Sequence, residues 1–171
     1  MKQLRYHHRL FTHWTIDREG EVYCALDPTF KAAVRTVGKR KKYRQVQIMN
    51  HGTLQWYYTH RLMAFSWLPR PKNKKLRIVD HKNGNSLDNR VENLRWITER
   101  GNNVNRLCYG LVKHGNLFVP KIASFEHRRF ASTDEATALM LRKILVECYV
   151  RFTIKFPDSG DYPHEKITNY K

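Results

Sequence analysis

The fold is decided by the stretch Ile78-Val79-Asp80-His81-Lys82-Asn83-Gly84 and the run Asn93-Leu94-Arg95-Trp96-Ile97 that follows it. Residues 78–81 predict a short strand end and residues 94–97 a second strand, and Asn83-Gly84 is the strongest two-residue hairpin signal in the chain. Thr98 can cap a helix that continues toward Arg106. The segment therefore predicts a strand-loop-strand-helix unit over residues 70–107.

The same segment carries side chains suited to metal-assisted hydrolysis. Asp80 and His81 place a carboxylate beside an imidazole at a strand end, where a sharp turn lets both serve one site. Asn102 and Arg106 share a helix face and can offer an amide oxygen to a metal and a guanidinium to a phosphate. One carboxylate and one amide suit Mg2+ rather than zinc. An imidazole, with an ordinary pKa of about 6.5, can accept a proton from water.

The charge of the chain indicates a polyanionic partner. Its 171 residues include 32 Lys and Arg against 15 Asp and Glu, a formal charge of +17. This excess favours double-stranded DNA, and no long apolar run or basic amphipathic helix favours a membrane. We expect a monomer, with a dimer as the alternative. The side chains expected to contact DNA are Lys39, Arg40, Lys41, Lys42, Arg44, Gln45, Gln47, Lys74, Lys75, Arg77, Lys82, Arg95, Asn105 and Arg106.

The three cysteines, Cys24, Cys108 and Cys148, are odd in number and far apart, so they predict neither a disulfide framework nor a zinc ribbon. The first residues lack the apolar core of a secretory signal. We therefore expect an intracellular protein, located in the host cytoplasm if a phage encodes it.

Residues 1–69 predict an N-terminal DNA-binding ribbon and helix. Residues 1–12 are either an arm or a strand, 21–26 form a strand and 27–42 form a loop. Residues 43–49 and 54–58 form a two-stranded ribbon whose width fits a DNA major groove. Thr59 caps a helix that ends before Pro69, and His60 is a capping or core residue.

Residues 108–156 predict a three-stranded sheet followed by a helix. The expected strands cover 107–112, 117–125 and 128–130, with Pro120 marking an edge strand or bulge. Ser132 and Glu135 form a capping box that opens a well-buried helix. Residues 157–171 are an extended polar tail.

Residues 79–106, from Val79-Asp80-His81 through Asn93-Leu94-Arg95-Trp96 to Asn102-Asn103, resemble the HNH homing endonucleases of phages and introns. The resemblance implies a ββα-metal core in which His81 is the general base and Asn93 braces the loop. It implies Asp80 and Asn102 as metal ligands, with Asn103 the alternative to Asn102. Because some members have a histidine where Asn102 stands, the amide favours Mg2+ or Mn2+.

The flanking segments carry looser resemblances. The segments 20–23, 43–58 and 60–62 resemble the amino-terminal module often fused before the HNH unit. The carboxy-terminal segment resembles the three-stranded DNA-binding module of plant ethylene-response transcription factors. Residues 130–136 are the part of the segment that matches best.

The sequence thus predicts an α+β protein with a ββα-metal core between an N-terminal β-ribbon and helix and a C-terminal three-stranded sheet plus helix. The expected function is that of a metal-dependent DNA endonuclease of homing type. The alternative is a non-catalytic, sequence-specific DNA-binding protein, which would explain the charge but not the spacing of Asp80, His81, Asn93 and Asn102.

Overall fold

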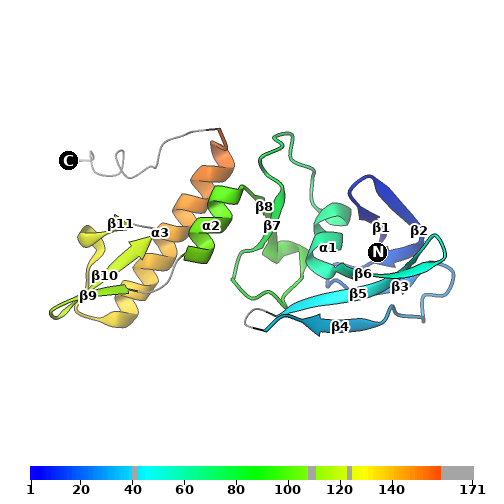
Figure 1. The fold of residues 1–171 in the computed structure, drawn as a ribbon, viewed down its shortest axis with the longest axis horizontal. Coiled ribbons are helices and arrows are strands. Elements are labelled where there is room, and N and C mark those ends of the chain that lie inside the picture. The colour runs from blue at the N-terminus through cyan, green and yellow to red at the C-terminus, as the bar shows by residue number, and fades with distance from the viewer. Residues whose placement is uncertain (40–41, 108–110, 123–124, 159–171) are drawn as a thin grey trace. The chain divides into compact units, whose positions relative to one another are not determined.

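A computed structural model describes residues 1–39, 42–107, 111–122 and 125–158, without the side chains of 104–107 and 125. The chain divides into a first unit of Met1–Lys72 and Val79–Trp96 and a second unit of Asn73–Ile78 and Ile97–Lys171. The described residues contain three α-helices and four small sheets, which confirms the predicted α+β class (Figure 1). Each unit combines two separate stretches of sequence, and the four consecutive segments expected above stay a prediction.

Two three-stranded antiparallel sheets build most of the first unit. The first has the order β1-β2-β3 and the second the order β4-β5-β6. Their bounds are Lys2–Tyr6 (β1), Arg9–Ile16 (β2), Val22–Cys24 (β3), Val34–Val37 (β4), Tyr43–Asn50 (β5) and Thr53–Tyr58 (β6). The N-terminal residues, left open as an arm or a strand, are thus strands. The turn at 50–52 is confirmed by the pairing of Asn50 with Thr53.

The prediction of a loop over 27–42 and of a two-stranded ribbon was wrong in one respect. Val34 pairs with Val46, so β4 adds a third strand and β5 becomes the central strand of its sheet. β4 is only four residues long and mostly exposed. So weak a local pattern becomes a strand only because β5 supplies its hydrogen-bonding partners.

Helix α1 (Thr59–Trp67) packs on both sheets through Leu62 and Met63, which are fully buried. The expected cap was wrong, because Thr59 is the first helical residue and Tyr58 is the N-cap, without a side-chain hydrogen bond. The helix ends before Pro69, as predicted, with Leu68 in extended conformation. The core it completes contains Leu4, Phe11, Trp14, Ile16, Val22, Ala32, Val46, Ile48, Leu62, Met63, Val91 and Leu94.

The strands β7 (Ile78–His81) and β8 (Leu94–Ile97) pair with each other and confirm the strand-loop-strand prediction. The prediction of a two-residue hairpin at Asn83-Gly84 was wrong, because residues 82–93, including the 3-10 helix η1 (Val91–Asn93), connect the strands. Gly84 still forms a turn, with φ of 75° and its N–H donating to the carbonyl of His81. A local turn signal therefore did not determine the loop length.

The second unit begins its helical part with α2 (Glu99–Leu107). Thr98 caps it as predicted, because its Oγ1 accepts from the N–H of Gly101 at 3.0 Å. An ideal Cβ on Gly101 would lie 2.7 Å from Oγ1 of Thr153 on α3 (Glu135–Lys155), so glycine permits the close approach of these two helices.

The predicted three-stranded sheet plus helix is present. The sheet has the order β11-β10-β9, with β9 Leu111–His114, β10 Leu117–Ile122 and β11 Phe125–Glu126. Two strand predictions were wrong. Leu107 ends α2, with residues 108–110 outside the described range, and residues 128–130 form the 3-10 helix η2 (Arg128–Phe130).

Strand β10 is the central strand, not an edge, although it contains Pro120. The carbonyl of Pro120 accepts from the N–H of His127. In an antiparallel strand the nitrogen and the carbonyl of one residue point to the same neighbour, so the proline nitrogen, which carries no hydrogen, also faces β11. The β10–β11 ladder pairs Lys121 with Glu126 and begins after the proline. Because proline has no N–H, Pro120 returns no hydrogen bond to His127, and the regular ladder starts one residue later.

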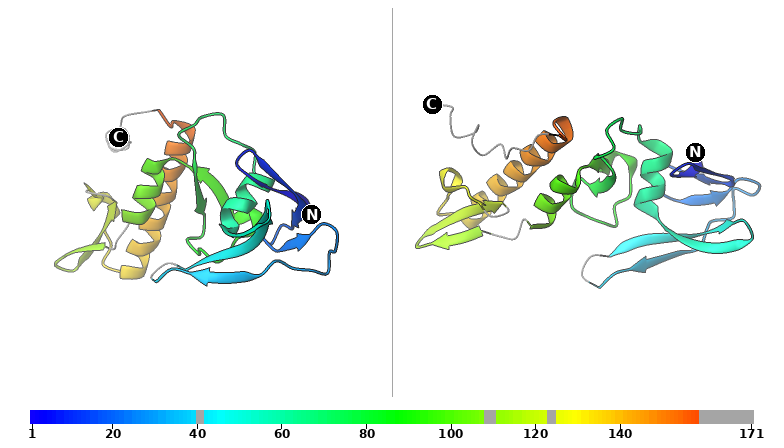
Figure 2. Two further views of the ribbon diagram at one scale, coloured as in Figure 1. Left: turned by 45° about the vertical axis from the view of Figure 1, so that its right-hand side comes forward. Right: turned by 45° about the horizontal axis from the view of Figure 1, so that its top comes forward.

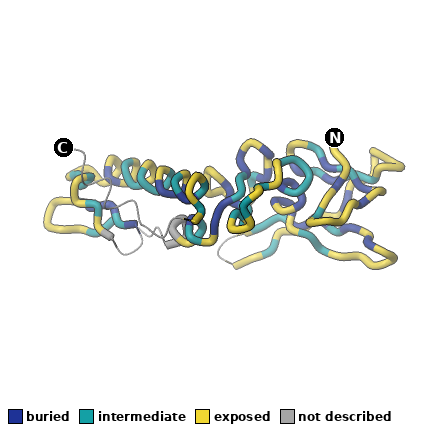
Figure 3. Tube along the Cα trace, turned by 90° about the horizontal axis from the view of Figure 1, so that it is seen from above, coloured by how far each residue is buried: buried dark blue, intermediate teal, exposed yellow. Residues whose placement is uncertain are grey.

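The predicted capping box and deep burial of α3 were wrong. Asp134 is the N-cap and accepts from the N–H of Thr137 at 2.8 Å, whereas Ser132 accepts from the N–H of Asp134. α3 buries Ala138 and Val150 but exposes Met140 to 57%, because it packs along one side only (Figure 3). In the tail, 157–158 form a turn and 159–171 lie outside the described residues. No helix in the described ranges is long and apolar enough to cross a membrane.

Candidate active site

Asp80 and His81 are both buried at the end of β7, with exposures of 6% and 4%. Oδ2 of Asp80 accepts from Nε of Arg95 on β8 at 3.0 Å, and the Arg95 side chain is only 12% exposed. Arg95 was predicted to contact DNA. The structure pairs it with the carboxylate of Asp80, so the two strands hold Asp80 in place, and the DNA contact of Arg95 stays a prediction.

Asn89 orients the imidazole of His81. Its Oδ1 lies 3.2 Å from Nε2 of His81, and its Nδ2 donates to the carbonyl of Leu87 at 3.1 Å. The bond to Leu87 fixes the orientation of the Asn89 side-chain amide, because a flipped amide would place Oδ1 against the Leu87 carbonyl oxygen, and both oxygens are acceptors. Oδ1 therefore faces His81, and Nε2 must carry the proton. The basic lone pair of the neutral ring is then on Nδ1.

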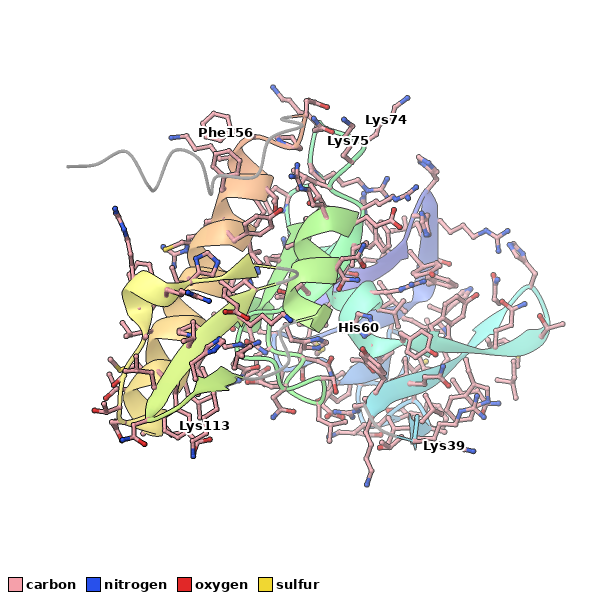
Figure 4. All side chains as sticks on the ribbon, turned by 60° about the vertical axis from the view of Figure 1, so that its left-hand side comes forward. Lys39, His60, Lys74, Lys75, Lys113 and Phe156 are labelled. Carbon is pink, nitrogen blue, oxygen red and sulfur yellow. The ribbon has the colours of Figure 1, made fainter. Side chains whose placement is uncertain are left out.

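Two further aromatic rings from the first unit lie beside this imidazole, and a third lies beside one of them. The ring of His60, in the first turn of α1, lies 5.3 Å from that of His81, and the ring of Tyr43 on β5 lies 6.4 Å from it. Tyr58 lies 5.6 Å from His60. His60 is 8% exposed and is therefore a core residue, one of the two roles expected (Figure 4 labels it). The site is thus completed by α1 and by the β5–β6 sheet.

Asn93 connects the two ends of the loop that follows His81. Its Oδ1 accepts from the N–H of Asn83 at 3.0 Å, and its Nδ2 donates to the carbonyl of Asp88 at 2.7 Å. These are the contacts that a loop-bracing residue makes, while a catalytic role of Asn93 stays a prediction.

Asp88 and Arg90 reinforce the same loop. Nε and Nη2 of Arg90 donate to the two carboxylate oxygens of Asp88 at 2.9 and 2.8 Å. The hydrogen bonds from Arg90, with a further one from Asn83, hold the pKa of Asp88 at about 2. The loop therefore depends on an ionised carboxylate.

Asn102 and Asn103 lie on α2 in the second unit, half-buried and exposed respectively. Asp80 and His81 belong to the first unit, so a metal site shared by Asp80 and Asn102 stays a prediction. Among the described residues, no three His, Cys, Asp or Glu side chains form a metal-binding group. The donor set proposed from the sequence, a buried carboxylate and an amide, consists of oxygen ligands and fits a hard divalent cation.

The predicted DNA-contacting side chains occupy different environments. Lys39, Lys42 and Lys74 are exposed (Figure 4 labels Lys39 and Lys74). Arg44, Lys75 and Arg77 form ion pairs with Glu21, Asp158 and Glu99, and Lys82 donates to the Glu92 carbonyl. Gln45 is buried and accepts from Arg35, while Gln47 is half-buried. Arg40 and Lys41, and the side chains of Asn105 and Arg106, lie outside the described residues.

Sequence reasoning missed Asn89 and placed His60 only as a cap or core residue. Asn89 lies within the HNH-like stretch, between Asp88 and Arg90, and that position was its only signal. Nothing local indicated that His60 would contact His81, because the two are 21 positions apart in the numbered sequence.

Residues 57–104 match the model of a protein family described as HNH endonuclease. The matched range contains His60, Asp80, His81, Asn89, Asn93 and Asn102, whereas Tyr43 lies outside it.

Residues 57–104 are thus similar to the HNH endonuclease family.

Individual relatives agree with this assignment. DNA endonuclease I-HmuI of Bacillus phage SP01 is 29% identical over 101 residues, covering 58% of this chain and 55% of that protein. An uncharacterised HNH endonuclease of Acanthamoeba polyphaga mimivirus is 31% identical over 87 residues, covering 51% of this chain and 25% of the relative. A second from the same virus is 49% identical over 45 residues, or 25% of this chain and 11% of the relative.

A solved structure describes DNA binding and cleavage by the HNH homing endonuclease I-HmuI. It matches 55% of this chain and 51% of its own with a TM-score of 0.45 and 29% identity. The chain spans between a tenth and just over half of the relatives that it matches. The similarity to the HNH family implies a divalent metal.

Proposed function

We propose that this protein is a metal-dependent DNA endonuclease of homing type, which hydrolyses phosphodiester bonds in double-stranded DNA. The observation that carries the proposal is the buried Asp80-His81 pair, whose imidazole is held by Asn89 inside the segment that matches the HNH family. The relation to I-HmuI, which is a DNA endonuclease, supports DNA as the substrate.

In the proposed mechanism, His81 is the general base. Its Nε2–H donates to Oδ1 of Asn89, so Nδ1 is the nitrogen that takes a proton from the attacking water. Protonation makes the ring positive and strengthens the bond to Asn89. The surrounding rings of His60 and Tyr43 limit rotation of the imidazole during this step.

Asp80 and Asn102 would hold Mg2+ or Mn2+, with Asn103 as the alternative to Asn102. The bound ion would stabilise the negative charge that develops on the phosphate and on the leaving oxygen. Arg95 keeps one carboxylate oxygen of Asp80 fixed, which orients the ligand group. Asn93 braces the loop after His81 and so keeps the imidazole near the phosphate.

A single HNH site acts on one strand, so we expect nicking by a monomer. Cleavage of both strands would require a second encounter or a dimer. Basic side chains contact the DNA backbone, and the β4–β5–β6 sheet together with the carboxy-terminal module supplies sequence preference.

Cleavage of plasmid, phage and genomic DNA by wild type, His81→Ala and His13→Ala tests the proposal. His13 is exposed on β2 and serves as the matched control. Wild type and His13→Ala should relax or linearise DNA with Mg2+ but not with EDTA. His81→Ala should bind DNA without cutting it. If wild type binds DNA but cuts none of these substrates, the non-catalytic alternative is correct.

A further inference from the structure

A groove of about 790 Å³ lies between the β1–β2 hairpin and the C-terminal end of α1, entirely within the first unit. We call it the hairpin groove. Its lining includes Lys2, Arg5, Arg9 and Arg70 together with His7 and His8, and no acidic residue. None of these residues was among the predicted DNA contacts.

The positive charge of the hairpin groove is not neutralised by the protein. Among the described residues, Lys2, Arg5, Arg9 and Arg70 form no ion pair, whereas Arg44 elsewhere in the same unit pairs with Glu21. Lys2, Arg5 and Arg9 are also exposed. Such a concentration of unpaired cations produces a strong positive potential and attracts an anion.

Two of the cations are held in place by aromatic faces. Nζ of Lys2 lies 4.7 Å from the ring centroid of Trp67, and the guanidinium of Arg70 lies 4.9 Å from that of Phe65. Arg18 lies over Trp67 as well, at 5.3 Å. Because these cations already occupy the ring faces, nucleic-acid bases cannot stack there. The groove therefore suits phosphates rather than unpaired bases.

The walls of the groove are joined to each other and to the active site. The N–H of Arg5 on β1 donates to Oγ of Ser66 on α1 at 2.9 Å, and Arg70 donates to the carbonyl of His7. His60, at the other end of α1, lies beside His81 (Figure 2 shows α1 next to the N-terminal hairpin). At a rise of 1.5 Å per residue, the seven residue steps from His60 to Trp67 separate the groove from the site by about 10 Å.

We propose that the hairpin groove binds the sugar-phosphate backbone of the duplex DNA substrate a few base pairs from the scissile phosphate. The inference rests on the proposed nuclease function for the identity of the substrate. A separation of about 10 Å corresponds to roughly three base pairs along the duplex. The groove fixes the register of the DNA and contributes affinity that is independent of sequence.

The test measures binding of the full-length protein to a duplex of about 30 base pairs in EDTA, where the metal is absent, over a range of KCl concentrations. The variant Lys2→Gln/Arg5→Gln/Arg9→Gln removes three exposed cations. The expected loss of affinity is about 10- to 100-fold near 150 mM salt, and the slope of log K against log salt should become shallower by about 2 to 3.

Two controls separate phosphate contact from other effects. Arg5→Lys/Arg9→Lys keeps both charges and should bind within about threefold of wild type. Arg9→Gln should weaken binding more than Lys31→Gln, which removes an exposed cation of the same unit outside the groove. Thermal melting of every variant verifies that the fold is intact.

The proposal is overturned if Lys2→Gln/Arg5→Gln/Arg9→Gln binds DNA with the affinity and the salt dependence of wild type. It is also overturned if this variant binds more weakly while the slope of log K against log salt stays unchanged. A groove-dependent preference for RNA over duplex DNA would also overturn it. The proposed function fails separately, if wild type shows no Mg2+-dependent cleavage. In that case the groove can still show its salt-dependent contribution to binding.

Discussion

Replacing Asn89 with leucine removes the acceptor that holds the Nε2 proton of His81. Leucine has a size similar to asparagine but offers no hydrogen bond, so the neutral ring loses its preference for carrying the proton on Nε2. The site is 3% exposed, which means that the substitution changes no surface that could touch DNA. The perturbation therefore acts on the general base and leaves substrate binding intact.

The expected size of the effect follows from the change in charge on His81. A hydrogen bond between neutral groups contributes about 0.5–1.5 kcal/mol, and one to a charged group about 1.5–3 kcal/mol. The bond to Asn89 thus favours the protonated ring by about 1–1.5 kcal/mol, close to a tenfold change in rate. We expect Asn89→Leu to lower kcat about tenfold with KM for DNA unchanged.

Single-turnover cleavage at saturating enzyme measures this loss, at a temperature where melting curves show every variant folded. Asn89→Asp supplies an oxygen acceptor again but sets its second oxygen against the Leu87 carbonyl, so it should recover part of the lost rate. Histidine-selective 15N spectra should place the proton of neutral His81 on Nε2 in wild type and on both nitrogens in Asn89→Leu. The reasoning is refuted if Asn89→Leu cuts at the wild-type rate, or if wild-type His81 carries its proton on Nδ1.

Three further substitutions test the ligand role, the packing and the loop. Asp80→Asn keeps an oxygen that can accept from Arg95 but removes the charge, so it should abolish cleavage at the Mg2+ concentration that saturates wild type. Wild-type cleavage across a Mg2+ titration, with an unchanged Mg2+ requirement, would contradict the ligand role. Gly101→Ala brings a methyl group to 2.7 Å from Oγ1 of Thr153 and should lower the free energy of unfolding, measured by chemical denaturation, by about 1–3 kcal/mol. The loss should be smaller in Gly101→Ala/Thr153→Ser, because the serine hydroxyl can rotate away from the methyl group. An unchanged stability of Gly101→Ala would show that α2 and α3 are not so close. Because Arg90 holds the pKa of Asp88 at about 2, below its usual 3.8, the stability that Asp88 contributes is fully present above pH 3.8 and is lost as the pH falls through about 2. Urea midpoints should therefore separate wild type from Asp88→Asn at pH 6 and converge near pH 2, and a constant difference would exclude this linkage.

Local sequence was enough to predict the elements whose signals are themselves local. The strands at 78–81 and 94–97, the Thr98 cap of α2 and the end of α1 before Pro69 were predicted from neighbours within a few positions. The sheet-plus-helix order of residues 111–155 followed in the same way. These predictions succeeded because a cap, a proline or a strand run acts through its adjacent backbone.

Local signals failed where a distant partner determined the outcome. Residues 34–37 are a strand because β5 pairs with them, and Asn83-Gly84 turns the chain without pairing the strands it precedes. Ser132 had the right residue type for a cap, but Asp134 lies where the free N–H of Thr137 points. The ion pair between Arg95 and Asp80 was not predicted either, because it depends on the pairing of two separate strands.

The sequence by itself determined the HNH motif, the strongly positive charge and the nature of the chemistry, because residue types at fixed short spacings carry that information. Only the tertiary structure decided which nitrogen of His81 is basic, which rings enclose it and where unpaired cations gather in a groove. Those properties depend on contacts between segments such as α1, the 82–93 loop and the β1–β2 hairpin, and hydrogen bonds and packing across such distances exist only once the chain has folded.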